Sequence, residues 1–251
     1  MAEFTQGSPI IIPFGADKVM ADQIFLSETA DGMEIHCRIP HVVIDRADRL
    51  PLRLNSGGLE FGEAPPLAQM PEVPDQLAYL LTHFQRHCTV WDKYPRAFLD
   101  RYFAFIHGQM MENRPELTKS LAKFKDLYRF DQWAFSALRP LPRAHLWAPE
   151  NAEIREFDAG QMLRVNFAFW TGAEIVAIDL IGTETRGEAH ATRRNRLTRN
   201  GVKIIEMRHE YLGETRSSDF AASLPPEFHG FWKTQPLPAG PFRTIPLPDP
   251  T

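Results

Sequence analysis

The chain has 251 residues, 43% of them hydrophobic and 24% charged, which is the balance of a globular protein with one large or two modest domains. A net charge of −4 excludes a protein that coats nucleic acid through bulk charge, so any such contact must come from a local basic face. The two cysteines, Cys37 and Cys88, exclude a disulfide framework and favour a reducing cytoplasm. No apolar run approaches membrane-spanning length, so no membrane contact is expected.

Residues 1–63 predict a β-rich N-terminal unit. Short apolar runs alternate with turn signals such as Asp31-Gly32 and Gly57-Gly58. The predicted strands cover residues 10–14, 24–26, 34–39, 42–44 and 50–54. Residues 64–74 are rich in proline and predict an extended linker. No residue of 1–63 receives a functional role.

Residues 75–114 predict a helical segment, with one helix over 75–87 and a second that begins at Pro95. A third helix is predicted from Pro115 to Leu138, because its apolar positions recur at alternating steps of four and three. Asp131 falls on that apolar stripe. An inward carboxylate is costly unless it is paired or belongs to a site, so Asp131 is a candidate site residue.

The stretch from Met162 to Met207 predicts strand, turn, strand, helix, strand. Its second strand, residues 175–181, is almost wholly apolar except for Asp179, and such an acid in a buried strand requires an explanation. In a hairpin through Thr171-Gly172, Asn166 lies opposite position 177 or 179, depending on the register. Asn166 and Asp179 are therefore expected to meet on one side of the sheet.

The helix of residues 188–200 is strongly basic and ends where Gly201 can adopt a left-handed conformation. The residues of this helix that could contact a nucleic acid are His190, Arg193, Arg194, Arg196 and Arg199. A charge run of this kind fits a solvated helix face as well as it fits a phosphate-binding face. In the same way, Asp179 can be read as a structural acid that pairs with Arg193.

The order "VNF…AIDLIG…H..R...L...G..II" resembles the core of the very-short-patch-repair endonuclease and its relatives, a branch of the PD-(D/E)xK nuclease superfamily. Asp179 falls on the central acid of that pattern and Gly182 on its glycine. Arg193 and Leu197 fall on its helix pair, and Gly201 falls on the glycine that ends the helix. The resemblance covers residues 126–210. It implies a restriction-endonuclease-like α/β domain over 115–212, with a mixed sheet flanked by helices.

Two positions depart from the pattern. Asn166 stands where the first strand should carry an acid, and Ile181 replaces the second member of the E-x-D/K pair. Asp131 matches the place where such relatives carry a glutamate on the helix ahead of the sheet. The resemblance therefore implies Mg²⁺ held by Asp179 and Asp131 with a carbonyl oxygen from Asn166, while Arg193 stabilises the developing charge. Because the site has lost a negative charge, Mg²⁺ is expected to bind weakly.

The function implied is that of a nuclease-fold protein that acts on or binds nucleic acid, DNA in preference to RNA. Its catalysis is expected to be impaired, and it is expected to work with a protein partner in a defence or repair system. The partner would bind the N-terminal unit or the proline-rich arm of residues 213–251, an arm that is either disordered or laid against the body or the partner. Two alternatives stay open: an active Mg²⁺-dependent endonuclease, and a protein-interaction subunit without nucleic-acid contact.

Overall fold

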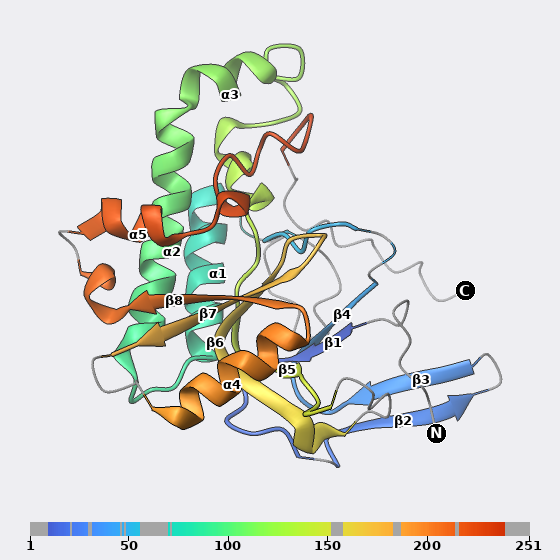
Figure 1. Ribbon diagram of the computed structural model, residues 1–251. Helices are drawn as coiled ribbons and strands as arrows, with labels where there is room; N and C mark the ends of the chain where they lie inside the picture. The colour runs from blue at the N-terminus through green and yellow to red at the C-terminus, as the bar shows by residue number, and fades with distance from the viewer. Residues whose placement is uncertain are drawn as a thin grey trace.

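The computed structural model contains a four-stranded mixed sheet in the order β5-β6-β7-β8 (Figure 1). It describes residues 10–20, 22–29, 32–45, 47, 49–55, 70, 72–151, 158–182, 187–213 and 216–238, with only the backbone given for residues 25–29 and 32–36. The strands are β5 (Leu141–Trp147), β6 (Met162–Trp170), β7 (Ile175–Ile181) and β8 (Val202–Arg208). β5, β6 and β7 run antiparallel in turn, whereas β8 is parallel to β7. The chain is thus an α/β protein with a mixed sheet.

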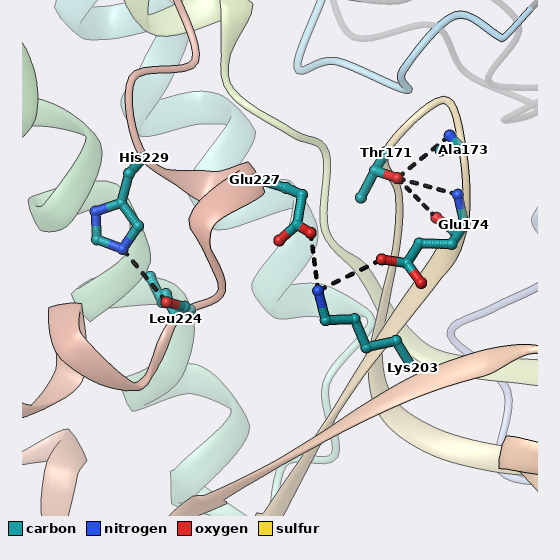
Figure 2. Close-up of polar contacts among 7 residues, drawn as sticks. All are labelled: Thr171, Ala173, Glu174, Lys203, Leu224, Glu227 and His229. Carbon is teal, nitrogen blue, oxygen red and sulfur yellow. Dashed lines mark hydrogen bonds and ion pairs between the residues drawn. The ribbon is translucent and has the colours of Figure 1, made fainter.

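The β6–β7 hairpin and the helix that follows agree with the sequence prediction. The hairpin turns at Gly172, whose φ is 93°, and the Thr171 hydroxyl oxygen accepts the amides of Ala173 and Glu174 at 3.3 and 3.1 Å (Figure 2). After β7, helix α4 (Glu188–Arg199) crosses over and ends before Gly201, whose φ is 78°. A crossover of this kind is what parallel strands require.

The two faces of the sheet are covered by different layers. Phe167, Val176 and Ile178 point into a large apolar cluster with α1 (Val73–Arg86) and α2 (Lys93–Glu112). Ala168 and Ala177 point into a second cluster, which contains Leu197 of α4. Figure 1 shows α4 across the strands on the side away from α1 and α2. A strand buried on both faces explains why β7 is apolar along nearly its whole length.

The third predicted helix, Pro115 to Leu138, is wrong. Its first part is α3 (Arg114–Ser120), which is followed by turns and then by the 3-10 helix η2 (Phe130–Ser136). Residues 122–127 are all exposed, with Leu127 at 74% and Phe124 at 38%, so a helix over these residues would have no packed apolar face to stabilise it. Asp131 consequently lies in the first turn of η2 and not on an inward helical stripe.

The N-terminal strands pair as two antiparallel ribbons, β1 (Ile10–Pro13) with β4 (His41–Ile44), and β2 (Ile24–Thr29) with β3 (Gly32–Cys37). The buried side chains of the β1–β4 ribbon belong to the same apolar cluster as those of the main sheet. The ribbon therefore packs on that sheet and has no separate core. The β2–β3 hairpin projects away from the body (Figure 1). Most of the predicted linker lies outside the described residues, but its last residue, Pro74, already belongs to α1.

The described part of the C-terminal arm, residues 216–238, packs against the body. It contains α5 (Ser217–Ser223) and η6 (Pro226–Phe228), and it buries Phe220, Phe228 and Trp232 in the large cluster. Lys203 of β8 binds Glu227 of this segment at 2.8 Å and Glu174 of the β6–β7 turn at 3.4 Å (Figure 2). Within the described residues, no helix is both long enough and apolar enough to cross a membrane.

Candidate functional site

The residues singled out in the sequence fall into two places, one on α4 and the strands beneath it, the other in the helical layer. Asp179 alternates along β7 with Ile178 and Leu180, which face α1 and α2, and so its side chain faces α4. Only 2% of Asp179 is exposed. A carboxylate buried to this extent needs a cation or several hydrogen bonds.

Arg193 supplies that cation. One of its terminal guanidinium nitrogens binds the Asp179 carboxylate directly, and the other donates to the main-chain carbonyl of Arg164 in β6. The Arg193 side chain is 25% exposed, so the guanidinium closes the site from the α4 side. The buried charge at Asp179 is therefore already compensated by the protein itself.

Asn166 lies where the hairpin register predicts it. Ala168 pairs with Ala177, and the same antiparallel register places Asn166 across from Asp179. Its amide oxygen accepts the main-chain amide of Leu180 at 2.9 Å. Asn166 thus accepts a hydrogen bond from a main-chain amide of β7 just beyond the last residue that pairs with β6. An aspartate could accept the same bond, but the bond needs no negative charge.

The structure does not bring Asp131 to Asp179. Neighbours of Asp131 in η2, among them Trp133 and Phe135, belong to the apolar cluster on the α1 and α2 side of the sheet, whereas Asp179 faces α4. Asp131 instead binds Arg129 at 2.9 Å. The two carboxylates predicted to share Mg²⁺ therefore belong to different layers, and the described residues contain no group of three or more metal-ligating side chains.

The arginines of α4 differ in what they contact. Besides Arg193, Arg196 is bound internally, through the carbonyls of Ala148 and Gln161 and the side chain of Gln161. Arg194 is 52% exposed and pairs with Glu206 at 3.1 Å, while Arg199 is exposed with no ion pair to the described residues. Arg193 and Arg196 hold the helix to the sheet, so less of each guanidinium is left for the predicted phosphate contacts than at Arg194 and Arg199.

A pocket of about 920 Å³ opens at the carboxyl ends of β7 and β8, beside the first turns of α4. This is the edge at which α/β sheets with parallel strands usually bind ligands. Its polar lining comes from Glu188, His190, Arg194, Asn195, Glu206, Arg208 and Tyr211. The Nδ1 of His190 lies 3.9 Å from Glu206, and its buried Nε2 has no hydrogen-bond partner among the described residues.

Arg208 and Tyr211 were missed by the sequence analysis. Arg208 is the last residue of β8, and Tyr211 belongs to the short 3-10 helix η4 (His209–Leu212). The available signal was their position directly after a strand parallel to its neighbour, because the ends of such strands meet at one edge of a sheet. Between them, His209 stacks on Tyr94 of α2, with ring centroids 3.6 Å apart and an angle of 12°.

The chain was compared with protein-family models, curated proteins and solved structures. No family model, curated protein or solved structure matches the chain.

Proposed function

We propose that this chain is a nuclease-fold protein that binds nucleic acid, DNA in preference to RNA, with impaired catalysis and with a protein partner in defence or repair. The observation that carries the proposal is the Arg193–Asp179 pair. Residues 162–208 follow the order of strand, strand, helix and strand that the resemblance implies, and the acid and the arginine of its pattern bind each other. A metal ion at Asp179 would have to displace a resident guanidinium.

The surroundings of Asp179 support impaired catalysis. A divalent cation that acts on a phosphodiester needs at least two carboxylates, and here the second sequence candidate, Asp131, belongs to the helical layer. Asn166 contributes a neutral oxygen that already accepts the Leu180 amide. Asp179 and Asn166 together offer one carboxylate and one neutral oxygen, which is fewer charged ligands than a hydrolytic metal ion needs.

The pocket beside α4 supports nucleic-acid contact. Arg194 and Arg208 are each more than half exposed, and their partners Glu206 and Glu210 hold them only in surface ion pairs. Such pairs contribute about 0–1 kcal/mol each, so a phosphate can replace the carboxylate at small cost. Because the chain as a whole is acidic, we expect modest affinity with a local origin.

The binding test compares labelled duplex DNA, single-stranded DNA and RNA over a range of salt concentrations. Replacing both Arg194 and Arg208 with Ala should lower the slope of log affinity against log salt by about 2, because two phosphate contacts are lost. Arg216→Ala is the matched control, since Arg216 is equally exposed but pairs with Asp219 in the C-terminal segment. If the parent protein binds none of the three probes, the protein-interaction alternative takes precedence.

The catalytic test incubates the parent protein and Asp179→Asn with the same probes in Mg²⁺ and in Mn²⁺. We expect no cleavage by either protein. Cleavage by the parent that disappears in Asp179→Asn would establish the active endonuclease in place of the impaired one.

A further inference from the structure

Trp91 stands apart from the other tryptophans of the chain. It is 94% exposed, and the adjacent Val90 is 72% exposed, whereas Trp133, Trp170 and Trp232 are at most 4% exposed. An indole left in water forgoes the stabilisation that burial would give. Val90 and Trp91 together form an adjacent exposed apolar pair, which makes Trp91 a candidate for contact with a ligand.

The backbone that carries Trp91 is held on both sides. The preceding residues end α1, where the main-chain amides of His87 and Cys88 bond to carbonyls of the last helical turn at 3.1 Å each. The following residue, Asp92, caps α2 by accepting the Tyr94 amide at 3.0 Å. Trp91 thus sits on a short connection between two anchored helices, which suits a contact that must be presented in a fixed position.

The connection lies next to the pocket described above. Tyr94, three residues after Trp91, stacks on His209, and His209 directly follows Arg208, which lines the pocket. In Figure 1 the first turn of α2 lies close to the ends of β7 and β8. Lys93 lies over the Tyr94 ring at 5.3 Å and has no ion pair with a described carboxylate. An exposed ring, a stacked pair and exposed cations therefore occupy one end of the molecule.

We infer that Trp91 is a stacking platform for an unpaired base, with Lys93 and Arg208 contacting the phosphates beside it. This rests on the proposed function and narrows its ligand to single-stranded nucleic acid or a frayed strand end. Bases in a duplex keep their faces stacked on each other, whereas an unpaired base offers a free face to an indole. The exposed cations at this end of the molecule, Lys93 and Arg208, favour a polyanion over an apolar segment of a protein.

The test measures affinity of the full chain for a labelled single-stranded oligonucleotide and for the same sequence as a blunt duplex. Trp91→Ala should weaken single-strand binding about tenfold, while Trp91→Phe, which keeps a ring, should retain most of it. Duplex binding should change less than twofold in either variant. Leu127→Ala is the matched control, because Leu127 is 74% exposed and lies after α3, which follows the last turn of α2, whereas Trp91 precedes the first turn. Thermal melting of Trp91→Ala should match that of the parent, since the ring makes no buried contact.

The outcomes separate this inference from the proposed function. Unchanged single-strand affinity in Trp91→Ala, together with weaker binding in the Arg194 and Arg208 variant, would overturn the stacking platform and leave nucleic-acid binding in place. Equal loss of single-strand and duplex affinity in Trp91→Ala would also overturn it. An absence of binding by the parent protein would overturn both.

Discussion

At the residue scale, Asp179 and Arg193 behave as one unit. The carboxylate is almost fully buried and depends on the guanidinium, whereas Arg193 is 25% exposed and can turn toward water if its partner is lost. Removing one member of a buried pair is most damaging when the charge that stays behind has no route to solvent. The two members of this pair should therefore differ in their effect on stability.

Replacing Arg193 with Ala should destabilise the protein by about 3 kcal/mol, because it strands a buried carboxylate. Asp179→Asn should cost clearly less, since a neutral amide can stay in place. The double variant should be more stable than Arg193→Ala alone, because the stranded charge is gone. Urea unfolding of the three variants measures these differences, and a double variant less stable than Arg193→Ala would contradict them.

At the scale of secondary structure, the sequence predicted correctly those elements whose formation depends on residues close to one another in the chain. The strands over 162–170, 175–181 and 202–208 and the basic helix between them follow from apolar periodicity and from two glycines, Gly172 and Gly201. The register that sets Asn166 across from Asp179 follows from the tightness of the hairpin. These features need no knowledge of distant parts of the chain.

Features that depend on contacts between distant parts of the chain could not be predicted from the sequence. β5 was not predicted, because Pro142 and Arg143 disguise the strand. Its apolar residues Leu141, Ala144 and Leu146 are buried in the cluster shared with the β1–β4 ribbon and β6. The stripe that placed Asp131 on a long helix was a coincidence of spacing: its residues on either side of the exposed stretch 122–127 are buried from two separate elements, α3 and η2. Likewise, whether an arginine of α4 faces phosphate or its own sheet depends on where carbonyls such as Ala148 lie.

The hairpin turn gives a prediction at this scale. Gly172 and Gly201 both have positive φ, but a Cβ on Gly172 would lie 2.5 Å from the Arg49 carbonyl oxygen, whereas a Cβ on Gly201 meets nothing within 4 Å. Gly201→Ala should cost about 1 kcal/mol for its left-handed backbone alone. Gly172→Ala should cost more, because it also pushes residues 49–51 away from the turn. Urea unfolding measures the free energy of unfolding of both variants. An equal decrease in the two would show that the contact with Arg49 does not affect stability.

At the scale of the whole molecule, histidines lie where the N-terminal segment meets the body. The His87 ring packs edge-on against Phe14 with centroids 5.4 Å apart, and His145 Nε2 lies 3.0 Å from the Ala16 carbonyl oxygen. Burial lowers the pKa of both imidazoles, helped at His87 by the positive charge of neighbouring groups, and the pKa of His87 falls to about 4. Acid should therefore weaken this junction.

The sign follows from the protons bound. An unfolded histidine takes up a proton near pH 6.5, whereas folded His87 does so only near pH 4, so the stabilisation is complete above pH 6.5 and is lost as the pH falls through this window. Because His87 is only partly buried, the loss is on the order of 1 kcal/mol after solvent screening. Melting temperature against pH measures it. His87→Gln should flatten the profile, while the same change at His107, an exposed position in α2, should leave it unaltered.

Arg53 donates to the carbonyls of Ser136 and Phe231 and, at 2.8 Å, to the hydroxyl of Thr234, a partner 181 residues further along the chain. During synthesis at 5–20 residues per second, Arg53 waits on the order of 10 s for that partner to be made. Tyr102 and Phe169, once they have been made, also lack the ring of Phe228 that packs against them in the folded protein. We therefore expect the nascent chain to expose these rings, and to be prone to aggregation, until Phe228 has left the ribosome.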